Sequence, residues 1–186
     1  MRRLILFNFV TLDGFFEGPK GQIDWHQVDG EFNDFSIEQL NQLDLIILGR
    51  KTYQLMESYW TSKEANSNDP IIAGFMNSKP KIVISTTLKS AAWNNTVLLK
   101  DNIAEEIAKL KNQPGKDIFI FGSALLADSF TNLGLIDEYR IMINPVVLGS
   151  GSTLFKPSNK KLGLSLIKTK IFDSGNVLLY YQPKNK

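Results

Sequence analysis

Four consecutive residues have the types and spacing to bind a phosphate ester: Gly49, Arg50, Lys51 and Thr52. The apolar run 45–48 before them predicts a strand buried on both faces, and the apolar spacing over 53–59 predicts a helix. A helix that begins directly after a strand directs free backbone N–H groups and a positive dipole end at one point. Arginine, lysine and threonine at that point favour an anionic ester such as a nucleotide phosphate. The alternative is a glycine turn with solvated basic side chains.

A second junction of this kind follows the buried strand predicted over 117–121. Gly122 and Ser123 come next, and a helix is predicted from there to about residue 133. Two such junctions at one edge of a parallel sheet can bind one extended ligand, as a dinucleotide requires. Ser85 and Thr86 follow another short strand, where hydroxyls either bond a phosphate or form a turn.

Few other residues suggest chemistry. Asp13 lies in a loop after the first predicted strand, and such loops line the ligand crevice of a parallel sheet, although aspartate before glycine is also a turn signal. His26 is the one histidine, and we favour a role for it in a loop or at a helix entry. Trp25 and Phe35 fit the core better than a ligand platform when taken alone.

The composition excludes several classes of protein. The 186 residues fit a single domain, which we expect over 1–186. Lys and Arg number 21 against 19 Asp and Glu, with the signs mixed, so we expect no nucleic-acid partner. The absence of cysteine excludes disulfides and thiol catalysis, and one histidine gives no metal site. No apolar stretch reaches the roughly 18 residues that a membrane span needs, so we expect a cytoplasmic protein.

The elements that must position these residues follow from periodicity. An amphipathic helix is predicted up to about residue 42, capped by Asp29 or Gly30. Residues 61–70 are expected to form a surface loop, and 71–77 a short helix. Strands alternate with helices up to residue 133, after which strands follow one another. This order predicts a three-layer α/β fold with a mostly parallel sheet and an antiparallel C-terminal hairpin.

These motifs, in this order, resemble the dihydrofolate reductase superfamily, and more closely the RibD C-terminal domain family of riboflavin-pathway reductases. The resemblance covers nearly the whole chain, from about residue 4 to 155. It rests on segments 12–14, 48–53, 82–85, 121–126 and 134–151. Each segment alone is a weak signal, and the ordered set is a specific one.

The resemblance implies NADPH bound across the carboxyl edge of the sheet. Phosphates would contact the first junction, at Gly49, Arg50, Lys51 and Thr52, and the adenosine side would contact Ser85 and Thr86. The pyrophosphate would pack on the second junction, formed by Gly122, Ser123, Ala124, Leu125 and Leu126. Dihydrofolate reductases have two adjacent glycines there, and this chain has Ser123 in the second position.

For the substrate, dihydrofolate reductases carry an acid on the first helix and an aromatic residue four positions later. Glu31 and Phe35 match that spacing, with Trp25 as the upstream tryptophan and Asp29 as the competing acid. Such a carboxylate could bind a pyrimidine or pterin edge through two hydrogen bonds. Asp13 belongs to an Asp-Gly motif typical of the riboflavin-reductase branch. The resemblance thus implies catalytic roles for Asp13 and Glu31 and substrate contacts for Trp25 and Phe35.

The resulting hypothesis is an NADPH-dependent reductase of a small heterocycle, related to 5-amino-6-(5-phosphoribosylamino)uracil reductase of riboflavin biosynthesis. The alternatives are dihydrofolate reductase and a non-catalytic NADP-binding module. The family also implies a homodimer formed through the C-terminal strands.

Overall fold

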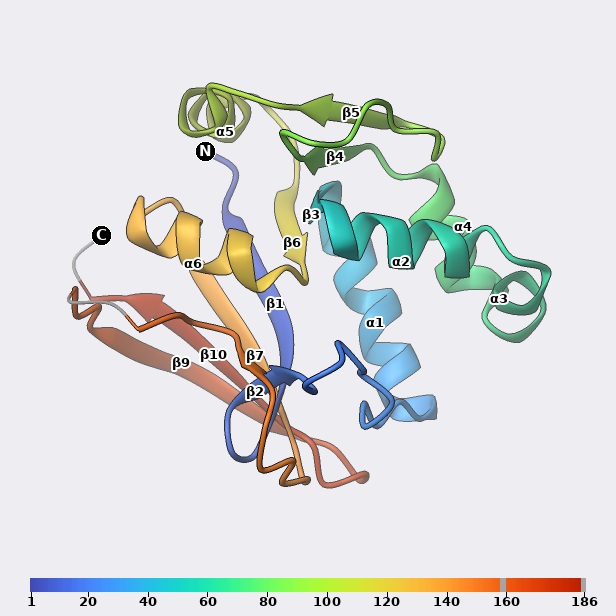
Figure 1. Ribbon diagram of the computed structural model, residues 1–186, viewed down its shortest axis with the longest axis vertical. Coiled ribbons are helices and arrows are strands. Elements are labelled where there is room, and N and C mark those ends of the chain that lie inside the picture. The colour runs from blue at the N-terminus through green and yellow to red at the C-terminus, as the bar shows by residue number, and fades with distance from the viewer. Residues whose placement is uncertain (158–159, 185–186) are drawn as a thin grey trace.

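The computed structural model describes residues 1–157 and 160–184, and an eight-stranded sheet lies at its centre (Figure 1). Its strands are β1 (Leu4–Thr11), β3 (Leu43–Gly49), β4 (Lys81–Ile84), β5 (Thr96–Leu99), β6 (Asp117–Phe121), β7 (Glu138–Asn144), β9 (Leu164–Ile171) and β10 (Val177–Pro183). The strand order is β5-β4-β3-β6-β1-β7-β10-β9. The strands from β5 to β7 in this order run parallel, and β10 and β9 are antiparallel. The predicted sheet with its antiparallel C-terminal hairpin is therefore confirmed.

Helices cover both faces of the sheet, as predicted for a three-layer α/β fold (Figure 1). They are α1 (Gly30–Gln42), α2 (Arg50–Trp60), α3 (Lys63–Asn68), α4 (Pro70–Ser78), α5 (Ile103–Asn112) and α6 (Ala124–Asn132). Side chains alternate along each strand, so β1 sends Ile5 and Phe7 into one core with α1, α2 and α4. It sends Leu4 and Leu6 into a second core with α5 and α6. The central strands are therefore apolar throughout.

Local capping fixes where the first helices begin. Asp29 is the N-cap of α1, and its carboxylate accepts a hydrogen bond of 2.8 Å from the Phe32 backbone N–H. The prediction that residues 61–70 form a loop is wrong, because α3 occupies most of that segment. Ser62 caps α3 by accepting from the Ala65 N–H at 3.1 Å, and Ala65 is fully buried. A cap and one apolar contact suffice for this short helix in an otherwise polar stretch.

A second, two-stranded sheet joins distant parts of the chain. It pairs β2 (Phe15–Glu17) with β8 (Ser152–Thr153) in antiparallel orientation. The carboxylate of Asp13 holds the neighbouring loop, since Oδ2 accepts from the Gly149 N–H at 2.7 Å and Oδ1 from the Leu148 N–H at 3.2 Å. Gly151 carries no side chain because a Cβ there would overlap the Glu17 carbonyl oxygen. This pairing fixes β2, whose residues reach the candidate site.

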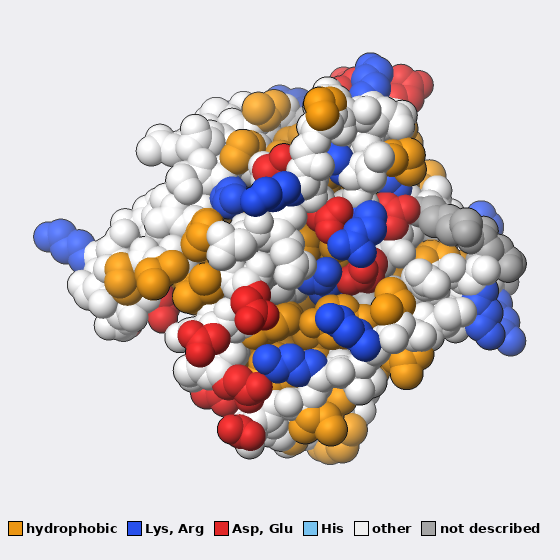
Figure 2. Space-filling model, turned by 180° about the vertical axis from the view of Figure 1, so that it is seen from behind, with side chains coloured by type: hydrophobic (Ala, Val, Ile, Leu, Met, Phe, Trp, Pro, Cys, Tyr) orange, Lys and Arg blue, Asp and Glu red, His pale blue; other side chains and the backbone are white. Residues whose placement is uncertain are grey.

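The surface of the molecule carries mixed charges. Figure 2 shows acidic and basic side chains interspersed with hydrophobic ones on the back of the molecule. This mixture agrees with the formal net charge of +2. Among the described residues, no helix has the length and apolar character needed to cross a bilayer.

Candidate functional site

The junction between β3 and α2 presents an open helix N-terminus. Gly49 is the N-cap residue of α2, and no side chain of the described residues caps the helix there. Its first N–H groups are therefore available to a ligand. Arg50 and Lys51 are the first two residues of the helix, so two cations stand beside the positive end of its dipole. This arrangement suits an anion.

The junction between β6 and α6 is closed by its own side chain. Gly122 and Ser123 both have positive φ, +67° and +66°, which turns the backbone sharply between strand and helix. The Ser123 hydroxyl caps α6 by accepting from the Leu126 N–H at 3.4 Å. A ligand there meets a serine-capped helix start and not a bare one.

The two junctions interlock. A Cβ on Gly49 would lie 2.7 Å from the Cβ of Ser123, and a Cβ on Gly122 would lie 2.8 Å from the Thr52 Cγ2. Each glycine therefore leaves room for a side chain of the opposite junction. The backbones of the two helix starts are held close enough to face one ligand.

A cleft of about 410 Å³ opens in front of the two junctions, and we call it the junction cleft. It brings together all the residues predicted to bind the cofactor except Gly122, which lines the neighbouring cavity. Phe16 and Glu17 of β2 form part of its wall, and no sequence pattern pointed to either residue. The residues that line it are Phe16, Glu17, Gly49, Arg50, Lys51, Thr52, Ile84, Ser85, Thr86, Thr87, Ser123, Ala124, Leu125 and Leu126.

The hydroxyl of Ser85, which lines this cleft, is hydrogen-bonded to the protein backbone. It accepts hydrogen bonds from the backbone N–H groups of Thr87, at 3.2 Å, and Leu88, at 3.0 Å. Ser85 thus forms a turn at the end of β4, which was one of its two predicted roles. Thr86 is exposed beside it.

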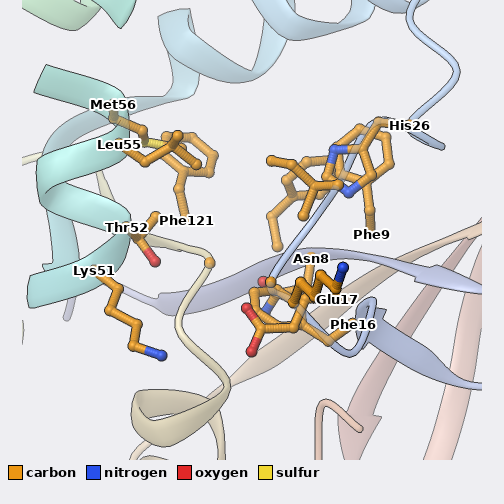
Figure 3. Close-up of a pocket in the computed structure, with 15 residues that line it drawn as sticks. Asn8, Phe9, Phe16, Glu17, His26, Lys51, Thr52, Leu55, Met56 and Phe121 are labelled. Atoms are coloured by element: carbon orange, nitrogen blue, oxygen red, sulfur yellow. The ribbon is translucent and has the colours of Figure 1, made fainter. Parts of the chain in front are cut away.

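A second cavity of about 440 Å³ adjoins the junction cleft, and we call it the aromatic cavity. The two share Phe16, Glu17, Lys51 and Thr52. Figure 3 shows Leu55 and Met56 of α2 on one side of the cavity and the rings of Phe9 and His26 on the other. Its lining is Phe7, Asn8, Phe9, Phe16, Glu17, Lys20, Gly21, Ile23, His26, Lys51, Thr52, Leu55, Met56, Phe121 and Gly122. These walls suit a flat, largely apolar ligand.

A smaller apolar recess lies beside the aromatic cavity. It has a volume of about 160 Å³, lies between α1, α2 and α4, and shares Phe7, Phe9, Met56 and Phe121 with that cavity. A ligand with an apolar extension would find room there.

His26 lies in the loop before α1, as the sequence predicted, and its ring also lines the aromatic cavity. Its ring stacks on Phe9 with centroids 4.4 Å apart, and its buried Nε2 has no hydrogen-bond partner among the described residues. Burial lowers the pKa of His26 to about 4, so the imidazole is neutral near pH 7. It can donate or accept a hydrogen bond there without carrying charge. The only signal for this placement was its position next to Trp25.

The four residues predicted for catalysis and substrate contact do not line the cavities described above. Asp13 holds the 148–149 loop through hydrogen bonds, and Glu31 accepts from the Asp173 N–H at 2.9 Å and pairs with Lys170 at 3.3 Å. Phe35 is buried in the core against Phe7 and Phe172, and Trp25 packs edge-on against His26. The structure therefore gives Asp13, Glu31, Trp25 and Phe35 packing and loop contacts.

Metal chemistry finds no support in the described part of the chain. No group of three or more His, Asp or Glu side chains there is arranged to hold an ion. A ligand in the two cavities would meet backbone N–H groups, basic side chains and aromatic rings.

Comparison with known proteins agrees with this geometry. The sequence model of the RibD C-terminal domain family matches residues 2–179. The uncharacterized protein YyaP of Bacillus subtilis (strain 168) is 42% identical over 182 residues, which are 97% of this chain and 94% of that protein.

Several solved structures share the fold. A provisionally named riboflavin biosynthesis protein from Shewanella sp. PV-4 has a TM-score of 0.77 at 24% identity, covering 98% of this chain and 99% of that one. The deaminase/5-amino-6-(5-phosphoribosylamino)uracil reductase of Thermotoga maritima has a TM-score of 0.70 at 12% identity, covering 98% of this chain and 56% of that one. Dihydrofolate reductase from Enterococcus faecalis, solved with NADP(H), has a TM-score of 0.67 at 14% identity, covering 98% and 97%. The likeness to these three proteins is a likeness of fold.

Proposed function

The chain belongs to the RibD C-terminal domain family, and on that premise we propose that it is an oxidoreductase that uses NADPH to reduce a small heterocycle. The observation that carries this proposal is the continuity of the two cavities. The junction cleft and the aromatic cavity meet at Phe16, Glu17, Lys51 and Thr52. A dinucleotide in the cleft would thus end where a flat ligand has its binding site.

The residues of the junction cleft fit the phosphates of such a cofactor. The uncapped N–H groups of α2 can donate hydrogen bonds to an anion, and Arg50 and Lys51 would balance its charge. Because Gly49 and Gly122 have no Cβ atom, the two helix starts can lie close to each other. When bound, a nicotinamide cofactor supplies the hydride, and the protein supplies orientation and a fitted pocket.

The aromatic cavity supports a small planar substrate. Phe9, Phe121 and Leu55 give the space beside the cleft apolar walls, and polar contacts strengthen when a bound ligand displaces water from such a space. Glu31, the acid that the resemblance assigns to an amidine edge in folate reduction, is not among the residues that line this cavity, and it is engaged with Asp173 and Lys170. A neutral heterocycle such as an aminopyrimidine of riboflavin biosynthesis is therefore the substrate class that we favour over dihydrofolate.

Two measurements test the proposal. The first titrates NADPH while following the fluorescence of the three tryptophans, with saturable quenching expected at tens of micromolar cofactor. The second follows loss of NADPH absorbance with a panel of aminopyrimidines, pterins and dihydrofolate. Absence of saturable quenching would overturn the cofactor assignment. Binding without turnover of any compound would favour the non-catalytic NADP-binding module.

A further inference from the structure

Asn8 is a polar residue in the middle of the apolar strand β1. It is 2% exposed, and neither its carboxamide nitrogen nor its carboxamide oxygen has a hydrogen-bond partner among the described residues. Asn144, on the neighbouring strand β7, is 0% exposed and paired at both ends. Its Oδ1 accepts from the Gln27 N–H at 3.0 Å, and its Nδ2 donates to the Met142 carbonyl at 3.4 Å. The comparison makes Asn8 an exception that calls for a physical reason.

Asn8 lies near residues that the two cavities share. It lines the aromatic cavity, and Figure 3 shows it on the same side as Phe16 and Glu17. The preceding residue, Phe7, pairs with Phe121 of β6, and its carbonyl accepts from the Gly122 N–H at 3.5 Å. Asn8 therefore stands next to the turn at which the second junction begins.

A buried carboxamide costs free energy unless something pairs with it. The group offers one acceptor and one donor side by side, so its best partner is an edge with a donor and an acceptor in matching order. Such an edge is neutral, as in the N–H and C=O of a lactam or imide. Aromatic side chains make up much of the rest of the cavity, and they suit the flat faces of a heterocycle.

We propose that the carboxamide of Asn8 selects the ligand of the aromatic cavity by pairing with a neutral amide-type edge of a planar heterocycle. The inference rests on the proposed function only in taking that ligand as the substrate. Binding itself can be measured without turnover.

The test uses two planar probes in the full-length protein. Lumazine (pteridine-2,4-dione) presents an imide edge, and 1,3-dimethyllumazine has the same rings without an N–H donor on that edge. The wild type is expected to bind lumazine more tightly than the dimethyl compound. Asn8→Leu should weaken lumazine binding by about tenfold, because two neutral hydrogen bonds are lost. Asn8→Asp, when ionised, should also weaken lumazine binding, because a carboxylate only accepts hydrogen bonds and cannot donate one to the lumazine carbonyl.

A stability measurement separates a ligand contact from a structural role. Asn8→Leu removes two unpaired polar groups, so its thermal midpoint should equal or exceed that of the wild type. The matched control Asn144→Leu strips hydrogen bonds from Gln27 and Met142 and should lower the midpoint. A similar fall in Asn8→Leu would show that Asn8 is paired within the fold and would overturn the proposal.

Three further outcomes are decisive. Equal affinity of the wild type for the two probes, no binding of lumazine, or lumazine affinity unchanged in Asn8→Leu each overturns the role of Asn8. NADPH affinity, measured in parallel, reports the junction cleft separately. If NADPH does not bind but the preference for lumazine depends on Asn8 as described, the proposed function fails and the role of Asn8 stands.

Discussion

The side chain of Ser123 occupies the space in which residue 49 would carry its Cβ. A Cβ built on Gly49 would lie 2.7 Å from the Ser123 Cβ and closer still to its hydroxyl oxygen. Gly49 has φ −79° and ψ 160°, values that any residue adopts. The glycine is therefore required by contact with the second junction and not by its own backbone conformation.

The stability lost by adding a side chain at residue 49 should be recovered by removing the side chain of residue 123. Gly49→Ala is expected to destabilise the fold by about 1–3 kcal/mol, because the added methyl overpacks against Ser123. Adding Ser123→Gly should recover at least half of that loss. Urea unfolding of both single variants and the double variant gives the coupling free energy. Strictly additive effects would contradict the contact.

Replacing the basic side chains at the first junction should weaken cofactor binding. Lys51→Ala and Arg50→Gln are each expected to raise the dissociation constant of NADPH by about tenfold or more, the value of a charge-assisted hydrogen bond. The effect should shrink as salt is raised. Tryptophan quenching at two salt concentrations measures both, with Lys109→Ala on the exposed face of α5 as the control. Equal affinities in Lys51→Ala, Arg50→Gln and the control would mean that the phosphates bind elsewhere.

The buried imidazole of His26 should make stability depend on pH. Its pKa is about 4 in the folded protein and 6.5 in the unfolded chain, because burial disfavours the charged ring. The unfolded state therefore binds the proton first, and stability is lost as the pH falls from about 6.5 to 4. The loss is at most roughly 3 kcal/mol from this group. Denaturant unfolding across this range gives the free energy of unfolding as a function of pH. This free energy should change less steeply with pH in His26→Phe than in the wild type, and parallel curves for the two proteins would contradict the assignment.

Asp13 should act on the site through the loop that it holds. Its pKa is lowered, first by the hydrogen bond from the Thr11 hydroxyl and then by the backbone N–H groups of Gly149 and Leu148. Asp13→Asn should lower the thermal midpoint above pH 4, and this difference should fade at lower pH, where the wild-type carboxylate protonates. Because β8 pairs with β2, NADPH affinity should also fall by a factor of roughly two to three. A loss of turnover with intact affinity and midpoint would instead support the catalytic role predicted from the sequence.

We also propose that the chain forms a homodimer through β9, the outermost strand of the hairpin side. Leu166, Ile167 and Ile171 are exposed on it, Ile171 at 73%. Light scattering should report twice the monomer mass. Ile171→Lys should give monomers, because a lysine blocks edge pairing. Val97→Lys on β5, the opposite edge strand, is the control, since Val97 is 64% exposed. A monomeric wild type would refute this arrangement.

The sequence predicted the eight strands of the central sheet, most helices and both junctions because these depend on local pattern. A buried strand, a glycine and an amphipathic helix can be recognised within about 20 residues, and the order of such units restricts the fold to a few topologies. The cofactor-binding prediction used the same signal, and the junction cleft gathers nearly all of its residues. The short helix α3 was not predicted because its only buried residue is an alanine, Ala65, which gives no apolar periodicity.

The substrate side depended on tertiary structure, for a geometric reason. Which way α1 turns about its axis is set by the packing of Phe32 and Phe35 on the sheet, and that rotation leaves Glu31 beside Asp173. The pairing of β2 with β8 joins residues more than a hundred positions apart, and it helps to hold Phe16 and Glu17 at both cavities. The sequence by itself determined a sheet with two strand–glycine–helix junctions. Only the three-dimensional packing decided that Asn8 and His26 line the aromatic cavity and that Asp13 and Glu31 bond to neighbouring loops.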